Sequence, residues 1–335
     1  MKKDKVYYFP PLPPASKNLV INPYSENFIN SLKKKFDVSN AKSSSSSALV
    51  DFFKNLFSSN LYIFNWIENI GKKKLGIIQF FLFLIGFFIL RLRKVKICWV
   101  VHNFHPHDGD STISILVKKL MLASSKIIIT HSSEARDYFS SRTKAQVKFF
   151  QHPSNHKLKN KYIDVQKEYD ILIWGTIEPY KGVLEFLQHH CRSQSSGKLR
   201  IKIIGRCKDK NIEMEILRFC NKFVEFENRI VPFDELNLLI QKSKFVLFPY
   251  ISSSISSSGA LIDTLSFEGN IIGPKKGAFK DLSSKGLCFV YKDYDEIYKI
   301  FESGLLIDPK KIKNFNEENN WIIFGDSFFN LYNTC

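Results

Sequence analysis

The sequence lacks the features of a secreted, disulfide-bonded protein. Its 335 residues include only six cysteines, which lie far apart without a CxxC pair and fall mostly in apolar runs. Such cysteines are typical of reduced thiols and not of a disulfide framework or a zinc site. The first residues also contain no long apolar stretch with a small-residue cleavage site, so we expect no secretion signal. These absences favour a cytoplasmic protein.

The sequence also lacks an apolar run long enough to cross a bilayer. The longest, residues 75–90, has sixteen residues with only Gln79 polar, whereas a spanning helix needs about 20. Basic residues flank this run on both sides: Lys72, Lys73, Lys74, Arg91, Arg93 and Lys94. They give no inside–outside asymmetry, so we expect the segment not to span a membrane.

Two structures remain open for residues 75–90. One is a buried crossover helix between a strand at residues 61–66 and a strand at residues 95–101, as a parallel sheet requires. The other is a helix in the bilayer interface, with the flanking cations on lipid headgroups. Both hold if one face packs on the sheet and the other meets lipid.

Acidic residues are scarce in the first half of the chain. Residues 1–150 contain 23 Lys and Arg against 9 Asp and Glu, and residues 151–335 contain 26 against 23. A lysine-rich genome would not explain this asymmetry. The basic half therefore predicts an anionic partner, either a membrane surface, a lipid-linked acceptor or nucleic acid. The lysines are scattered among expected helices without an RNA-binding motif, so we expect no nucleic acid.

The order of elements predicts an α/β protein with two doubly wound, Rossmann-like domains. Strands alternate with helices throughout, which is typical of parallel sheets, and the length suits two domains of about 150 residues. We expect an N-terminal domain at residues 1–152, a linker at 153–168, a second domain at 169–316, and a helix at 317–335 with apolar spacing.

Three strands of the second half end in loops suited to an anion. The strand at residues 171–173 leads through Gly175 to Lys181 and Gly182 at a helix start, where a cation and free N–H groups coincide. The strand at 199–204 ends in Gly205 and Arg206. A third, at 245–250, runs into serines and Gly259. Because ligands of open α/β sheets bind at this edge, we expect a phosphorylated ligand there.

Alternatives remain for these loop residues. Lys181 could be a solvated lysine, but at a helix N-terminus it opposes the dipole, which favours an anion ligand. Arg206 could bind a diphosphate or pair with Asp209. The serines before Gly259 are either a flexible run or a nest of donors for phosphate, and their position between strand and helix favours the nest.

Five motifs carry a resemblance, and they occur in order: Gly175-x5-Lys181-Gly182, Ile203-Ile204-Gly205, Ser258-Gly259-x3-Asp263, Ile271-Ile272-Gly273-Pro274 and Gly277-x-Phe279-x-Asp281-Leu282. Together they resemble the C-terminal half of GT-B nucleotide-sugar glycosyltransferases of the surface-polysaccharide type, over most of residues 95–333. The resemblance implies two Rossmann-like domains facing across a cleft, with the acceptor on the first and the donor on the second. It also implies a last helix that crosses back to the first domain.

The resemblance further implies a donor site. Its residues would be Gly175, Thr176, Lys181, Gly205, Arg206, Ser257, Ser258, Gly259 and Asp263. This chain departs from the pattern at Thr176, where many members have Arg, and at Ser256 and Asp263, where they have Glu. The donor base, its sugar and the stereochemical outcome therefore stay open. Lys181 and helix N-termini would neutralise the diphosphate, so we expect no metal and no cofactor.

A loop with three histidines and two carboxylates follows the strand at residues 97–101. It resembles the HNxxPHE loop of bacterial surface-polysaccharide glycosyltransferases, with Asp108 in place of the usual Glu. Asp108 is our expected base for the acceptor hydroxyl, and Asp110 or His105 could hold the role instead. A metal site at His105, His107 and Asp108 is the less favoured alternative. His102, directly after the strand, is expected to be a hydrogen-bonded support of the turn.

The resemblance implies a glycosyltransferase of the hexosyltransferase type. It would move a sugar from a UDP- or GDP-linked donor to a lipid-linked glycan in polysaccharide biosynthesis. We expect it to be cytoplasmic and peripheral on the inner face of the cell membrane, held by the basic first half. A sugar-nucleotide epimerase or hydrolase of the same architecture, and a non-enzymatic nucleic-acid-binding protein, are the alternatives.

Overall fold

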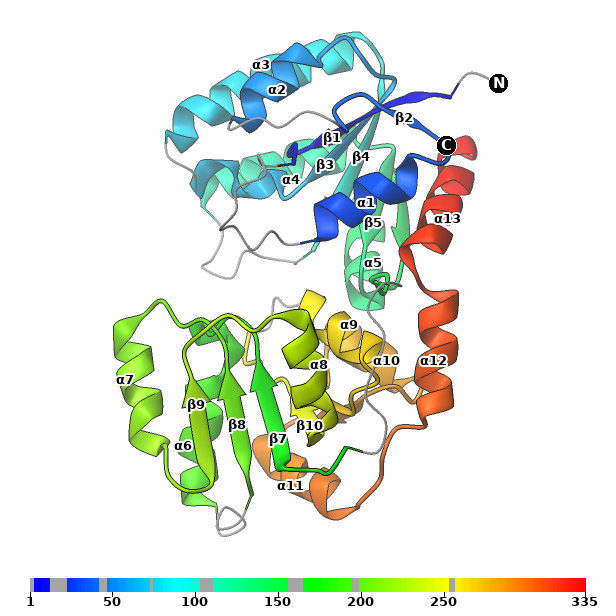
Figure 1. Ribbon diagram of the computed structural model, residues 1–335. Helices are drawn as coiled ribbons and strands as arrows, with labels where there is room; N and C mark the ends of the chain where they lie inside the picture. Colours follow the sequence, from blue (N-terminus) through cyan, green and yellow to red (C-terminus); the bar gives the residue numbers. More distant parts are fainter. Residues whose placement is uncertain are drawn as a thin grey trace. The chain divides into compact units, whose positions relative to one another are not determined.

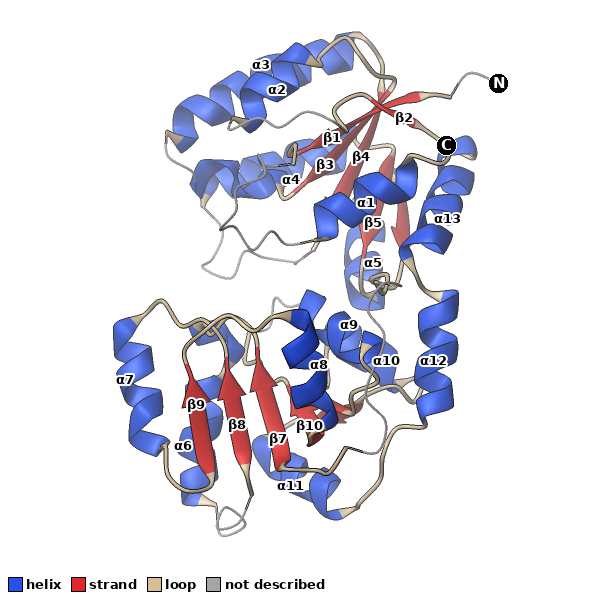
Figure 2. Cartoon of the chain, viewed as in Figure 1, coloured by secondary structure: helices blue, strands red, loops and turns tan. Residues whose placement is uncertain are grey.

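The computed structural model describes residues 3–12, 23–41, 47–72, 75–102, 111–155, 165–193, 199–252 and 257–335. They form two compact units, one of Met1–Gln151 with Trp321–Cys335 and one of His152–Asn320 (Figure 1). Each unit has a six-stranded sheet covered by helices (Figure 2). All strand pairs are parallel, which confirms the α/β class.

The sheet of the first unit has the strand order β2-β1-β3-β4-β5-β6. Its strands are β1 (Lys5–Phe9), β2 (Asp37–Val38), β3 (Leu61–Asn65), β4 (Lys96–Val101), β5 (Ile127–Thr130) and β6 (Gln146–Phe149). The central strands are apolar except at their ends, as expected for strands with helices on both faces of the sheet. Trp99 of β4 points into one core and Cys98 into the other, which is the alternation of a strand.

Helices cover the two faces of this sheet unequally (Figure 1). One face carries α2 (Ala48–Lys54), η1 (Ile67–Lys72), α3 (Gly76–Leu92), α4 (Thr112–Ser124) and α5 (Ser133–Ser140). The other carries α1 (Tyr24–Leu32) and α13 (Trp321–Asn333). The C-terminal helix is therefore part of the core of the first unit, where Phe324 and Phe328 pack against Phe28.

Helix α3 has one face packed on the sheet, as expected for a crossover helix, and one face that is exposed. Phe83 and Phe87 are buried against the sheet, and Gly86 lies so close to Phe52 that a Cβ would be 2.5 Å from its ring. The opposite face is apolar but exposed, with Phe81 at 59% and Phe88 at 63%. None of the helices in the described part of the chain has both the length and the hydropathy to cross a membrane.

The second unit has the strand order β12-β11-β10-β7-β8-β9. Its strands are β7 (Tyr169–Trp174), β8 (Ile201–Ile204), β9 (Val224–Glu227), β10 (Ser243–Leu247), β11 (Ile271–Pro274) and β12 (Phe289–Tyr291). One core contains residues of α8 (Phe233–Gln241), α9 (Gly259–Ser266), α10 (Gly277–Ser283) and α12 (Pro309–Glu318). The other contains residues of α6 (Val183–Arg192), α7 (Lys210–Phe219) and α11 (Tyr294–Glu302).

Two predicted elements end differently in the structure. The predicted strand at 245–250 ends at Leu247, two residues before Pro249, which cannot donate to a sheet hydrogen bond. The apolar pattern from residue 317 predicted one helix, but the helix breaks between Glu318 and Trp321. Asn319 leaves the helical conformation there, and its side-chain amide donates to His152 O at 2.9 Å.

Candidate donor-binding site

Three loops meet at the carboxyl edge of the second sheet. Gly175 N, after β7, donates to Ile204 O of β8 at 3.1 Å, and Ile177 N donates to Arg206 O at 2.9 Å. The loop after β10 joins them because Ile251 N donates to Tyr180 O at 3.1 Å. The loops that the sequence placed on one edge are thus tied together by backbone hydrogen bonds.

Glycines permit this close approach. A Cβ on Gly205 would lie 1.7 Å from Gly175 O, so a larger residue would force the two loops apart. Gly182 has φ +66°, and a Cβ there would lie 2.1 Å from Pro249 O. It caps α6 in the left-handed conformation that favours glycine. The short helix η2 (Pro179–Lys181) lies in the chain between Gly175 and Gly182.

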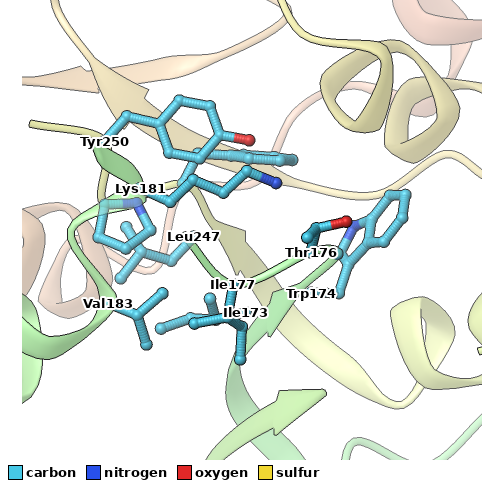
Figure 3. A pocket seen from close by; sticks show the side chains of 11 residues that line it. Ile173, Trp174, Thr176, Ile177, Lys181, Val183, Leu247 and Tyr250 are labelled. Atoms are coloured by element: carbon cyan, nitrogen blue, oxygen red, sulfur yellow. The ribbon is translucent and has the colours of Figure 1, made fainter. Parts of the chain in front are cut away.

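Lys181 projects from η2 across a small pocket and lies beside Tyr250 (Figure 3). Its Nζ is 5.8 Å from the centre of the Tyr250 ring. Burial lowers the pKa of Lys181, because the surrounding protein disfavours the charged form. No carboxylate of the described residues forms an ion pair with it, so the cation is available to an anionic ligand.

The pocket has an apolar floor and a polar rim. It is lined by Ile173, Trp174, Gly175, Thr176, Ile177, Lys181, Val183, Leu247, Phe248, Pro249 and Tyr250. Thr176, one of the predicted donor residues, stands on the rim opposite Tyr250 (Figure 3). A ligand entering here would contact both a cation and apolar surface.

The N-terminus of α9 lies beside this pocket and receives no side-chain cap from its N-cap residue. Ser258 occupies the N-cap position but makes no side-chain cap, since its Oγ pairs with the Tyr250 hydroxyl at 3.2 Å. The Ser257 Oγ is buried and has no hydrogen-bond partner in the structure as described. A Cβ on Gly259 would meet nothing within 4 Å. Open space at Gly259, a helix N-terminus without a cap from Ser258, and a Ser257 hydroxyl without a partner among the described residues together suit a phosphate.

Asp263 lies one turn into α9 and is partly buried. Burial raises the pKa of its carboxyl group to about 7. No hydrogen bond or ion pair links this carboxylate to another side chain of the described residues. A carboxyl group held in this way gains from a ligand that donates hydrogen bonds to it.

Arg206 lies apart from Lys181. It lines a separate open hollow of about 420 Å³ with Lys208, Asn228 and Arg229. The alternative pairing with Asp209 is not formed, because the Asp209 carboxylate accepts from Asn211 N at 2.8 Å and caps α7. The structure thus places Arg206 on the same edge of the sheet but not in the Lys181 pocket.

The predicted catalytic residues His105, Asp108 and Asp110 lie outside the described residues, as does His107 of the alternative metal site. His102, which precedes them, is described. Its Nε2 lies 2.7 Å from Asn65 Oδ1, and its ring stacks on Trp66 with centroids 4.8 Å apart. His102 therefore supports the turn, as expected.

A network of polar residues that neighbours His102 was not predicted from the sequence. The buried Tyr24 hydroxyl lies 2.6 Å from His131 Nε2, and His131 Nδ1 lies 2.8 Å from Phe150 O. Because a carbonyl only accepts, Nδ1 donates and Nε2 accepts. Burial lowers the pKa of His131 to about 4, so the ring is neutral. The signal was present, since Asn65 and His131, like His102, end or follow apolar strands.

Comparisons with known proteins agree with this architecture. The sequence matches no protein-family model and no curated protein. In structure, the chain is similar to HepE of Anabaena, solved with UDP-glucose, at a TM-score of 0.72 and 10% identity over 99% of this chain and 100% of that one. AviGT4, a glycosyltransferase involved in avilamycin A biosynthesis, gives 0.61 and 13% over 98% and 97%.

The trehalose-6-phosphate synthase OtsA gives a TM-score of 0.66 and 11% identity, over 98% of both chains. The similarity extends over nearly the whole length of this chain and of each of the three proteins. At such low identity the likeness establishes the fold and leaves activity to be argued from the site. The chain has the GT-B fold of nucleotide-sugar glycosyltransferases.

Proposed function

We propose that this protein is a glycosyltransferase that moves a sugar from a nucleoside diphosphate donor, UDP- or GDP-linked, to a lipid-linked glycan in polysaccharide biosynthesis. The observation that carries the proposal is Lys181, a partly buried cation without a described carboxylate partner, beside the uncapped N-terminus of α9. This is the place in a parallel sheet where a diphosphate binds. HepE, whose fold the chain shares, was solved with UDP-glucose.

Each part of the donor would have a partner in this site. Lys181, Ser257, Ser258 and the N–H groups of α9 would hold the diphosphate, since a cation and a helix N-terminus both favour negative charge. Asp263 would accept hydrogen bonds from the ribose hydroxyls. The charge neutralisation comes from the chain itself, so the proposal includes no metal and no cofactor.

The acceptor side of the proposal rests on the first unit. Asp108 would take the proton of the acceptor hydroxyl, with Asp110 or His105 as the alternative base, and these residues follow the fixed His102. The excess of basic residues in the first half suits the phosphate groups of a lipid carrier. We place the enzyme in the cytoplasm, peripheral on the inner face of the membrane.

Thermal unfolding with added nucleotide tests the donor site. UDP, GDP, ADP, CMP and dTDP are screened, and the cognate one at about 100 times its Kd should add about 2.7 kcal/mol to the free energy of unfolding. Lys181→Ala should remove most of this gain without unfolding the protein. Lys299→Ala, which removes an exposed lysine of α11, is the matched control. If no nucleotide stabilises the wild type, the donor site is wrong.

A further inference from the structure

The first unit exposes an unusually apolar surface on α3 and α4. We define the apolar face by its members, which are 40–67% exposed: Ile77, Ile78, Phe81, Leu82, Ile85, Phe88 and Leu92 of α3, with Ile115 and Leu116 of α4. The two helices are neighbours on one side of the sheet (Figure 1). Many exposed apolar side chains on two neighbouring helices indicate a site of interaction with another molecule or a membrane.

The charged residues of α3, of α4 and of the hollow at their ends all have one sign. Neither α3 nor α4 contains an aspartate or a glutamate. Where both helices end, an open hollow of about 780 Å³ is lined by five cations, Arg91, Lys119, Lys126, Arg142 and Lys144, and by no carboxylate. Arg91 lies one turn after Phe88, and Lys119 lies one turn after Ile115. The hollow, which we call the basic hollow, therefore borders the apolar face.

Two of these cations have a structural role. Arg142 Nη1 donates to Tyr138 O at 2.6 Å, and Arg91 Nη1 lies 3.5 Å from Ser124 O, so both complement helix C-termini. Lys119, Lys126 and Lys144 form no ion pair within the described residues. Three exposed cations gathered at one hollow repel one another unless an anion joins them.

Arg93, which the sequence grouped with the flanking cations, is not part of this surface. Its guanidinium donates to the Tyr62 hydroxyl at 3.1 Å and to Leu56 O, and it lies over the ring of Phe57. It therefore holds the loop after α2. Its replacement would disturb the fold, so Arg93 is left out of the test below.

We propose that the apolar face and the basic hollow together dock this protein on an anionic phospholipid bilayer. The apolar side chains would enter the interface, and the hollow would take a phosphodiester headgroup. A second copy of the chain fits less well, because a symmetric pairing of this surface would bring two sets of cations together. This docking rests on the proposed function, because a lipid-linked acceptor lies at a membrane surface.

Vesicle co-sedimentation tests the proposal. The full chain is mixed at low and high salt with vesicles of phosphatidylcholine or of an equal mixture of phosphatidylcholine and phosphatidylglycerol. One variant carries Phe81→Ser, Ile85→Ser and Phe88→Ser. A second carries Lys119→Gln, Lys126→Gln and Lys144→Gln, and it keeps Arg91 and Arg142 because of their structural role. The control removes the same number of charges from exposed lysines of the second unit: Lys222→Gln, Lys299→Gln and Lys310→Gln.

We expect the wild type and the control to bind the mixed vesicles at low salt and to be released by high salt. The hollow variant should bind them roughly 10- to 100-fold more weakly, since each cation near an anionic surface contributes about 1 kcal/mol before screening. The serine variant should lose binding at least as strongly. Equal binding by all four proteins would overturn the proposal.

Light scattering of the same proteins without lipid tests whether a second copy of the chain binds the apolar face instead of a membrane. A wild type that dimerises with rising concentration, and a serine variant that stays monomeric, would assign the face to a second copy and also overturn the proposal. The nucleotide stabilisation described above is measured on each variant. Because the donor site lies in the other unit, loss or retention of the nucleotide stabilisation tests the proposed function separately from vesicle binding.

Discussion

Asp263 gives the proposed donor site a pH-dependent feature at the level of a single residue. Its carboxyl pKa is about 7 in the folded protein, above the ordinary value of 3.8. The protonated form is therefore favoured by folding. This contribution to stability is complete below pH about 4 and is lost as the pH rises through about 7.

Asp263→Asn should remove this pH dependence, because the amide carries no charge when it is buried. The gain in Tm of the variant over the wild type should be larger at pH about 8 than at pH about 5, and the variant should bind the cognate nucleotide more weakly. A Tm difference that stays constant over this pH range would show that the carboxylate is well solvated. Undiminished nucleotide binding would remove Asp263 from the donor site.

At the level of the elements, the donor site depends on the close crossing of the β7 and β8 loops. Gly205→Ala places a methyl group against Gly175 O, so the backbone must shift. We expect it to destabilise the protein by at least about 1–3 kcal/mol, the usual effect of overpacking. Gly259→Ala has open space and should change stability by less than about 0.5 kcal/mol.

Gly259→Ala, the milder of the two substitutions for stability, should have a clear effect on nucleotide binding. The Gly259 methyl group would stand at the N-terminus of α9, where the phosphate is expected, and should weaken the cognate nucleotide at no cost in Tm. Denaturant unfolding and nucleotide titration of both variants give the two readouts. Normal stability of Gly205→Ala, or full nucleotide affinity of Gly259→Ala, would contradict this description of the edge.

The sequence predicted most elements because their signals are local. Apolar runs ending at Gly175 and Gly205 marked strands and loops, and the loops do meet on one edge. The contact of Lys181 with Tyr250 could not be predicted, since it depends on how β10 lies beside β7. The pairing of Tyr24 with His131 joins residues 107 positions apart and has no local pattern.

At the scale of the whole molecule, the candidate donor-binding edge and the apolar, basic surface lie on different units. The second unit carries the candidate donor-binding edge, with Lys181 and the N-terminus of α9. The first carries the apolar face, the basic hollow and most of the net positive charge, because acidic residues are scarce in it. The donor site that we propose on one unit and the membrane-docking surface that we propose on the other are what a transferase with a soluble donor and a lipid-linked acceptor would require.

Transfer of labelled sugar tests this account most directly. The protein is incubated with nucleoside diphosphate sugars of the base that stabilises it, together with a lipid extract of its own cells. The account predicts that label passes into the lipid fraction with the wild type. With Lys181→Ala the label should stay in the donor, and with Asp108→Asn transfer should fall by roughly 10² to 10⁴. Label released only as free sugar, or found in a different nucleotide sugar, would indicate a hydrolase or an epimerase and contradict the account.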